Sequence, residues 1–211
     1  MSVIDIEADA LRAFECMRDG GIAILPQSVG YSLIAARPAP LKRIFDTKRR
    51  KPSKLNAMLG NDAIASELYV LSNRGREVLD AITRCYDLPL GAIAPFRRTH
   101  PIFGLLDDHM MERSTKDGTL LMLINAGPFH AAITRLSHRH QVALFGSSAN
   151  VSMTGTKFSS DDIELEIRAI ADVSIDYGLM KYHPYQASST LLNLETLEVV
   201  RYGSCYEDIR D

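Results

Sequence analysis

The sequence predicts a single α/β domain over residues 1–211, with a mixed, twisted sheet flanked by helices. Three observations support this prediction. Short apolar runs typical of buried strands alternate with segments of helical periodicity. The stretch STLLNLETLEVVRYG near the end reads as a hairpin joined around Glu195 and Thr196, which adds antiparallel strands. Finally, no linker, internal repeat or low-complexity stretch divides the chain.

The first half of the chain is expected to begin with a helix over residues 7–19, which Gly20 and Gly21 end. GIAILP then reads as a short buried strand closed by Pro26, and the polar stretch 27–32 follows it. We expect a helix after Pro40, a short strand in LNAMLG, and helices in DAIASELYVLS and NRGREVLDAITRCY.

The second half opens with residues 87–118, a region rich in Pro and His whose elements the pattern does not assign. TLLMLINAG is expected to form a buried strand and PFHAAITRLSHRH a helix. QVALFGSSAN reads as a strand that opens into a loop. SSDDIELEIRAIA starts with Ser and acids, as a capped helix does, and the C-terminal hairpin follows it.

Composition favours a soluble, cytoplasmic protein. The net charge of −2 argues against a protein that coats nucleic acid by bulk charge, although local basic patches stay possible. Three widely spaced cysteines fit a reducing compartment and give neither a disulfide framework nor a zinc signature. The first residues carry acids where a signal peptide carries bases, and no apolar run is long enough for a membrane span.

The basic run Lys48-Arg49-Arg50-Lys51 has two interpretations. It is either a solvated helix end, where cations suit the helix dipole, or a phosphate site. In the second case Lys48 and Arg50, both expected to be exposed, would grip a phosphate chain from two sides. The run alone does not decide between them.

Two further polar sets follow predicted strands. Ser148 and Asn150 close one strand and would point the same way if the chain stays extended, although Ser and Asn also occur in ordinary turns. Ser189 and Thr190 form the other set with Arg201, a strand residue of the C-terminal hairpin.

The histidines and the common nucleotide motifs add little. His138 and His140 form an H-x-H pair that has no obvious third metal ligand, so a solvated helix end is favoured over a metal site. Walker A, G-x-G-x-x-G, H-E-x-x-H and G-x-S-x-G motifs are absent from the sequence.

Taken in order, GGIAILPQSVGYSL, IFDTKRR, SSAN and STLLNLETLEVVRYG resemble the YrdC-like family, which includes the TsaC-type threonylcarbamoyl-adenylate synthases. The resemblance spans roughly residues 18–204. The matching positions are Lys48 and Arg50 for the family's K-x-R, Ser148 and Asn150 for its S-x-N, Ser189, Thr190 and Arg201 for its C-terminal nucleotide-contacting set, and Pro26, Tyr31 and Leu33 for its opening motif.

The resemblance implies a YrdC-like fold with a basic concave surface, and a carbamoyl-adenylate-forming nucleotidyltransferase. In the family, L-threonine, bicarbonate and ATP give threonylcarbamoyl-AMP and pyrophosphate, with Mg²⁺ bridging phosphate oxygens, and the product feeds modification of adenosine 37 in tRNA. Lys48 and Arg50 would be catalytic, and the S-x-N and C-terminal sets would bind the nucleotide. The family is also described as binding double-stranded RNA.

The departures concentrate on the amino-acid side. The opening P-T-D-T-x-Y-G-L reads PQSVGYSL here, closer to the YciO branch, so Gln27, Ser28 and Tyr31 are expected in the substrate pocket. In R-x-P-x-H the Arg is Ala126, whereas His130, the last expected pocket residue, is kept. The family's P-G-P-x-T block has no counterpart, and Met153 stands at the Gly of the S-G pair that follows S-A-N.

Three hypotheses follow. The first is an ATP-dependent nucleotidyltransferase with L-threonine as default substrate and an altered amino-acid or amine specificity. The second is a non-catalytic paralogue that binds double-stranded RNA or tRNA and shows salt-sensitive binding without ATP turnover. The third is a structural α/β domain with chance motifs.

Overall fold

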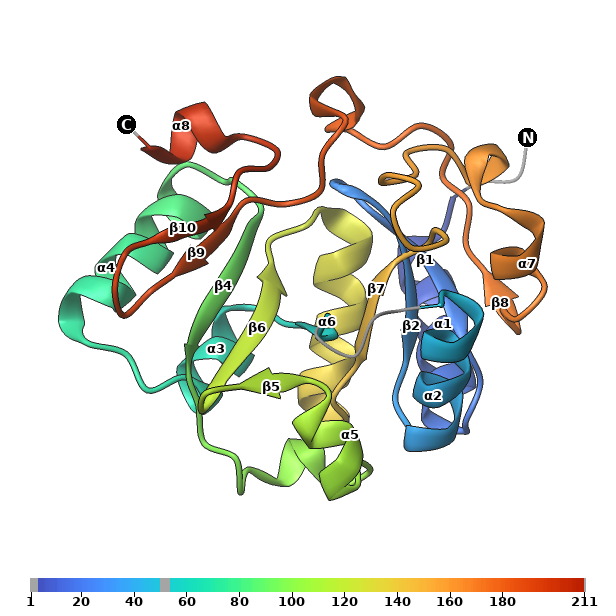
Figure 1. Cartoon of the computed structure of the whole chain (residues 1–211), viewed down its shortest axis with the longest axis horizontal. Coiled ribbons are helices and arrows are strands. Elements are labelled where there is room, and N and C mark those ends of the chain that lie inside the picture. The colour runs from blue at the N-terminus through green and yellow to red at the C-terminus, as the bar shows by residue number, and fades with distance from the viewer. Residues whose placement is uncertain (1–3, 50–53, 211) are drawn as a thin grey trace.

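A ten-stranded mixed sheet runs through the protein (Figure 1). The computed structural model describes residues 4–49 and 54–210. The strands are β1 Ala23–Gln27, β2 Gly30–Ala35, β3 Ala57–Leu59, β4 Leu90–Pro95, β5 Thr115–Lys116, β6 Thr119–Ile124, β7 Phe145–Ser148, β8 Val173–Ser174, β9 Leu191–Asn193 and β10 Val199–Arg201. Their order is β10-β9-β4-β6-β3-β7-β2-β1-β8, and β5 pairs with β6. The sheet does not close into a barrel, and the predicted α/β class is confirmed.

Both strand directions occur side by side in this sheet. β1 pairs antiparallel with β2, β2 with β7, and β4 with β6, whereas β3 runs parallel to β6 and β4 runs parallel to β9. β9 and β10 form the expected C-terminal hairpin. β3 is only three residues long, so it joins β6 and β7 over a short stretch.

Eight α-helices flank the sheet in the described residues: α1 Ile6–Arg18, α2 Pro38–Thr47, α3 Asp62–Leu68, α4 Asn73–Asp80, α5 Asp108–Glu112, α6 Pro128–His140, α7 Leu165–Arg168 and α8 Tyr206–Arg210. A π-helical turn, Ala81–Cys85, extends α4. Asp5 caps α1 by accepting a hydrogen bond from the backbone N–H of Ala8 at 3.0 Å. None of these helices is long and apolar enough to cross a membrane.

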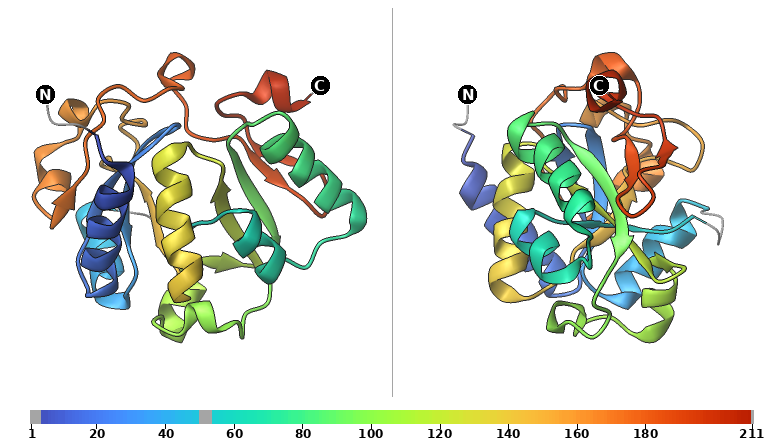
Figure 2. Two further views of the ribbon diagram at one scale, coloured as in Figure 1. Left: turned by 180° about the vertical axis from the view of Figure 1, so that it is seen from behind. Right: turned by 90° about the vertical axis from the view of Figure 1, so that its left-hand side faces the viewer.

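The core is divided between two groups of helices. α1 and α6 lie side by side against the sheet (Figure 2). Phe14 of α1 and Ile133 of α6 are fully buried on the faces that pack there. A larger cluster packs under α2, α3 and α4, with Leu41, Ile64 and Leu79 among its members. Helical spacing of apolar residues correctly predicts Phe14, Leu41 and Ile64 as buried, because each helix buries one stripe of its surface.

Two predicted elements differ from the structure. The polar stretch 27–32 contains the start of β2, a fully buried strand that the two residues Ser28 and Val29 join to β1. The helix expected over 159–171 is wrong. That segment holds a 3-10 turn at Ser160–Asp162 and the four-residue α7, because Glu164 is extended and its carboxylate accepts hydrogen bonds from Val151 N and Thr154 Oγ1.

Residues 87–118, which the sequence pattern does not assign, contain β4, a 3-10 turn at Pro101–Phe103, α5 and β5. β4 is central to the sheet, and six of its residues pair with β6. Its sequence LGAIAP contains small residues rather than a long apolar run, which explains why periodicity misses it.

His130 lies in the first turn of α6 and is only 1% exposed. Its Nε2 lies 3.1 Å from the carbonyl oxygen of Leu123, so this nitrogen carries the proton and donates it. Burial lowers the pKa of His130 to about 4, because the charged imidazolium would lose its hydration. The histidine therefore links α6 to β6 in its neutral form.

This arrangement predicts that the protein loses stability as the pH falls. The unfolded chain binds a proton at His130 near its ordinary pKa of 6.5, and the folded protein does so only near 4. The neutral-histidine contribution is therefore complete above pH 6.5 and is lost as the pH falls toward 4. Relative to pH values above 6.5, the loss of stability is about 2 kcal/mol at roughly pH 5.

The measurement is urea unfolding of the wild type and of His130→Gln at about pH 7.5 and pH 5. Glutamine offers an N–H to the Leu123 carbonyl but does not titrate, and all carboxylates are shared by the two proteins. The free energy of unfolding of the variant should therefore fall less on acidification. Equal losses in both proteins would contradict the assignment.

Candidate functional site

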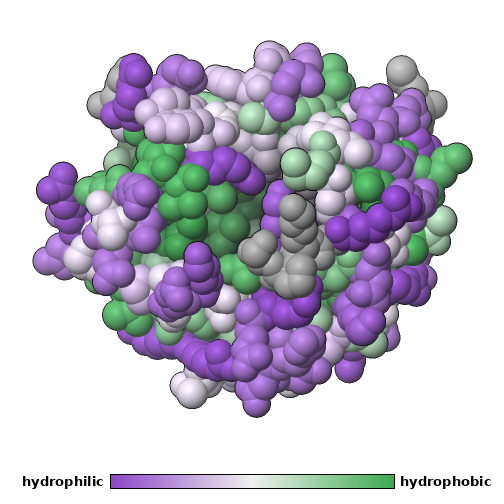
Figure 3. Space-filling model, in the orientation of Figure 1, coloured by the Kyte–Doolittle hydropathy of each residue, from purple (hydrophilic) through white to green (hydrophobic). Residues whose placement is uncertain are grey.

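A cavity of about 220 Å³, here called the sheet cleft, is lined by residues of eight strands: β1, β2, β3, β4, β6, β7, β9 and β10. Residues 54–55 and 188–189 also contribute to it. Figure 3 shows a hollow over β4 and β6 whose visible wall is largely hydrophobic. The apolar part of the lining includes Leu55, Leu121, Leu123 and Leu191. The cleft therefore offers an apolar floor.

The structure brings several predicted site residues together at this cleft. Gln27, Tyr31, Ser148, Ser189 and Arg201 all line it, although they come from four separate parts of the chain. The antiparallel pairing of β2 with β7 sets Ser32 opposite Ser148 and so brings the two motifs to one place. The order and register of the strands thus bring residues of the opening motif, the S-x-N motif and the C-terminal hairpin to one cleft.

The described lining of the cleft carries two cations, Lys54 and Arg201, and no carboxylate. The guanidinium of Arg201 donates from Nη2 to the carbonyl oxygen of Ser189 at 2.6 Å, which fixes its position. Burial lowers the pKa of Arg201, yet a guanidinium stays charged at neutral pH. The described wall therefore has a positive potential and attracts anions.

Hydroxyl and amide groups stand beside these cations. Ser147, Ser148, Ser188 and Ser189 line the cleft, and so does Gln27. Within the described residues, the buried Gln27 Oε1 and Ser147 Oγ have no hydrogen-bond partner. Buried polar atoms are nearly always paired, so these two oxygens mark places where a ligand or water completes the network.

Lys48 does not occupy the exposed position that the sequence predicts. It follows α2 and is only 1% exposed. Its ammonium donates to the carbonyl oxygens of Ser148 and Asn150, the latter at 2.6 Å, and to Asn150 Oδ1 at 3.2 Å. A buried charge requires such partners, so Lys48 holds the loop after β7 in place.

Asn150 and Thr190 also fix neighbouring backbone through hydrogen bonds of their side chains. Asn150 Oδ1 also accepts from the Ser148 hydroxyl, and its Nδ2 donates to the Val151 carbonyl at 2.6 Å. The Thr190 hydroxyl donates to the Ser204 carbonyl at 3.0 Å and accepts from Gly203 N–H at 3.1 Å. Both side chains are buried and set the backbone that presents Ser148, Ser189 and Arg201.

Tyr31 is among the residues that line the cleft, and its hydroxyl contacts the segment 176–178. That oxygen lies 2.7 Å from Asp176 Oδ1 and 2.9 Å from the Gly178 carbonyl, and it accepts from Tyr177 N–H at 3.2 Å. Burial, followed by the hydrogen bond to Asp176, raises the pKa of Tyr31, so the phenol stays protonated. Tyr31 therefore fastens the segment 176–178 to the sheet.

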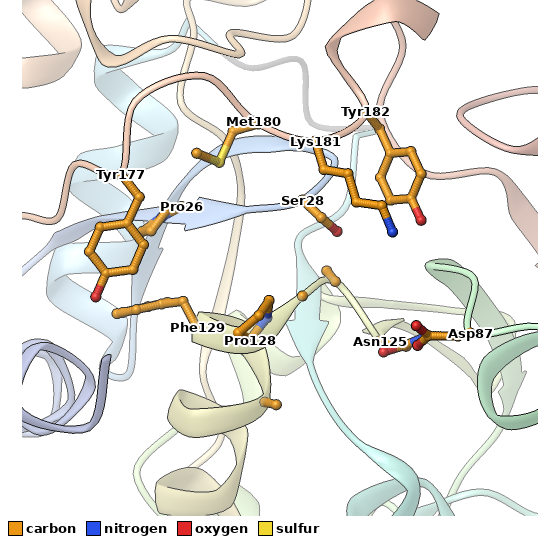
Figure 4. A pocket seen from close by; sticks show the side chains of 13 residues that line it. Pro26, Ser28, Asp87, Asn125, Pro128, Phe129, Tyr177, Met180, Lys181 and Tyr182 are labelled. Carbon is orange, nitrogen blue, oxygen red and sulfur yellow. The ribbon is translucent and has the colours of Figure 1, made fainter. Parts of the chain in front are cut away.

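Two predicted pocket residues lie away from the sheet cleft: Ser28 lines a second cavity, and His130 is buried in α6. The predicted catalytic residue Arg50 lies outside the described residues. The second cavity, here called the helix-end cavity, measures about 520 Å³ and lies at the start of α6 (Figure 4). Consecutive residues, Gln27 and Ser28, thus line different cavities.

Sequence reasoning missed Lys54, Ser147, Ser188 and the apolar floor. Ser147 and Ser188 each neighbour a predicted residue, so a wider motif would have included them. The floor residues Leu121 and Leu123 alternate with the fully buried positions of β6, a period-two pattern inside an apolar run. Only the three-dimensional sheet shows that this second face lines a cleft.

The comparisons with known proteins agree with this architecture. The Sua5/YciO/YrdC family, whose description reads "Telomere recombination", matches residues 15–203. A hypothetical protein from Streptococcus mutans has a TM-score of 0.78 at 19% identity, covering 94% of this chain and 88% of that one. E. coli YciO has a TM-score of 0.71 at 19% identity, covering 93% and 90%.

P. abyssi Sua5, in a structure complexed with L-threonine, has a TM-score of 0.71 at 18% identity, covering 91% of this chain and 52% of that one. The present chain thus spans about half the length of that Sua5 chain. At these identities the structural neighbours establish the fold alone. No curated protein sequence matches the chain.

The Lys48 contacts predict a large loss of stability for Lys48→Met. Methionine retains an apolar stem but removes the charged donor that three oxygens share, which should lower the free energy of unfolding by about 2–4 kcal/mol. Lys42→Met is the control, because this lysine lies on α2, the helix that Lys48 follows, in an exposed pair with Asp46. That variant should differ from wild type by less than about 0.5 kcal/mol.

Urea unfolding measures both variants, and backbone amide exchange at Ala149 and Asn150 reports on the loop. Exchange there should accelerate in Lys48→Met alone. Similar stabilities for the two variants would show that the buried ammonium does not hold the loop.

Proposed function

The chain belongs to the Sua5/YciO/YrdC family, and from this premise we propose that it is an ATP-dependent nucleotidyltransferase that forms a carbamoyl-adenylate. The observation that carries the proposal is the sheet cleft. Its described lining combines Lys54 and Arg201 with a row of serine hydroxyls and an apolar floor, and it contains no carboxylate. A nucleotide has matching parts, namely an anionic phosphate chain and an apolar base.

The proposed reaction requires positioning and charge neutralisation more than covalent participation by the protein. The substrate amine and bicarbonate condense to a carbamate with loss of one water, and a carbamate oxygen attacks the α-phosphorus of ATP. The new oxygen–phosphorus bond forms as the bond between the α-phosphorus and the bridging oxygen breaks, and pyrophosphate leaves. Arg201 and Lys54 would offset the charge on the phosphates, and the Ser147 and Ser148 hydroxyls would orient them.

The described residues do not offer a site for a resident Mg²⁺. They contain no group of three or more His, Cys, Asp or Glu side chains suited to a metal ion, and the cleft lining has no carboxylate. Mg²⁺ prefers carboxylates together with substrate phosphates. We therefore propose that the ion enters only as a complex with ATP, and no step is assigned to it here.

L-Threonine is the default amino acid because a Sua5 neighbour was solved with it. The present cleft has Gln27 and Val29 in its wall, with an amide oxygen that lacks a partner among the described residues. This oxygen requires a donor, so the substrate should present an N–H or O–H to it. We therefore propose that the amine substrate differs from L-threonine. We also propose a cytoplasmic location.

The test is pyrophosphate release across a panel of amino acids and amines, with ATP, Mg²⁺ and bicarbonate present. The expected result is release that depends on both the amine and bicarbonate. The alternative is a non-catalytic module that binds double-stranded RNA or tRNA. Salt-sensitive RNA binding, with no ATP binding by calorimetry and no pyrophosphate, would replace the proposal with that module.

Arg201 provides a sharper prediction. In Arg201→Gln the charge is lost while an N–H donor for the Ser189 carbonyl remains, so the fold should persist. The affinity for ATP in calorimetry should fall roughly tenfold or more, since a charge-assisted contact to phosphate disappears.

The matched control is Arg49→Gln. Arg49 is exposed at the end of α2, pairs with Glu166 at 3.3 Å, and does not line the cleft. Its loss should leave ATP affinity unchanged. Equal affinities of wild type and Arg201→Gln would remove the phosphate assignment from the cleft.

A further inference from the structure

The helix-end cavity is separate from the sheet cleft and has a built interior of its own. It lies between the tip of the β1–β2 hairpin, the start of α6 and the segment 177–182 (Figure 4). The linings of the cavity and the cleft share no residue among those described. A ligand here would therefore touch a different set of side chains from a nucleotide in the cleft.

One part of the cavity is polar and carries both signs of charge. Asp87, Asn125, Lys181, Tyr182 and Ser28 line it, and Figure 4 shows the Lys181 amine and the Ser28 hydroxyl directed inward. The carboxylate of Asp87 accepts from Asn125 Nδ2 at 2.9 Å. Within the described chain, Asp87 and Lys181 do not form an ion pair with each other. Two opposite charges thus face one cavity without neutralising one another directly.

The other part is apolar. Pro26, Phe129, Tyr177 and Met180 line it, and Figure 4 shows Tyr177, Pro26 and Phe129 together at one end. The rings of Phe129 and Tyr177 meet edge to face at a centroid distance of 5.8 Å. The Tyr177 hydroxyl is directed to Asp9, 3.0 Å away, which leaves the ring to form the wall.

Backbone hydrogen bonds hold the walls in place. Ser28 N–H donates to the Ala126 carbonyl at 2.7 Å, and Tyr182 N–H donates to the Ser28 carbonyl at 2.9 Å. The hairpin tip is thereby fastened to both other walls. Gly127, at φ 101°, precedes α6 and lets the chain pass close to Ser28, where a Cβ would lie 3.3 Å from Ser28 Cβ. The cavity is therefore preformed, which lowers the entropic cost of binding.

We propose that the helix-end cavity binds a free α-amino acid with an apolar side chain, such as leucine or phenylalanine. Its carboxylate would pair with Lys181 and the Ser28 hydroxyl, and its ammonium would pair with Asp87. The apolar side chain would lie among Pro26, Phe129, Tyr177 and Met180. A zwitterion fits because it supplies both missing charges at once, whereas a simple anion or cation would leave one charge of the cavity unmatched.

Calorimetry on the full chain tests the proposal with L-leucine and L-phenylalanine as probes. Isoamylamine and 4-methylpentanoate keep the leucine-like body but carry a single charge each, so they should bind at least tenfold more weakly. Lys181→Gln and Asp87→Asn should each weaken the amino acids by roughly tenfold or more. Both changes preserve shape, and asparagine tolerates the positive φ of residue 87.

Arg201→Gln serves as the matched control, because it alters the sheet cleft and should leave amino-acid binding here unchanged. Absence of binding by either amino acid at millimolar concentration would overturn the proposal. So would binding that is insensitive to Lys181→Gln and Asp87→Asn, or binding lost only in Arg201→Gln. These outcomes are independent of ATP binding and pyrophosphate release, so failure here is distinguishable from failure of the proposed enzymatic function.

Discussion

The buried ammonium of Lys48 is the interaction on which the geometry of the sheet cleft depends. It joins the end of α2 to the loop after β7, across 102 positions of sequence to Asn150. An ion removed from water is tolerated only where several oxygens replace its hydration, and three protein oxygens do so here. The same contacts orient the Ser148 and Asn150 backbone, so this charge shapes the wall of the cleft.

With that loop fixed, the sheet supplies the rest of the site by register. The short β3 contributes Ala57 and Leu59 to the lining, with β6 and β4 on one side of it in the sheet and β7 and β2 on the other. The cations of the lining are Arg201 of the C-terminal hairpin and Lys54, which precedes β3, and serines near strand ends supply hydroxyls. Alternate leucines of β6 form part of the apolar floor. Polar recognition and apolar contact area thus come from different elements, which lets each vary while the scaffold stays the same.

Much of this architecture could be predicted from the sequence, and the failures have physical causes. Apolar periodicity identified α1, α6, β6 and β7, since each buries a regular face. It missed β2, because the Ser28-Val29 turn lacks the usual Asn-Gly signal and the strand contains polar residues that are nevertheless buried. It overextended α7, because the contacts of Glu164 override helix propensity. The motifs located Ser148, Ser189 and Arg201 at one cleft, but the burial of Lys48 depends on carbonyl groups that no local pattern reveals.

The hairpin tip that separates the two cavities has a consequence for how the molecule responds to its ligands. Gln27 lines the sheet cleft and the next residue, Ser28, lines the helix-end cavity, so one peptide unit joins the two linings. Any ligand that shifts this unit from one side changes the free energy of occupancy on the other side, and thermodynamic linkage makes the influence equal in both directions. A substitution at Gln27 or Ser28 that changes one cavity therefore also alters a residue bonded directly to the lining of the other.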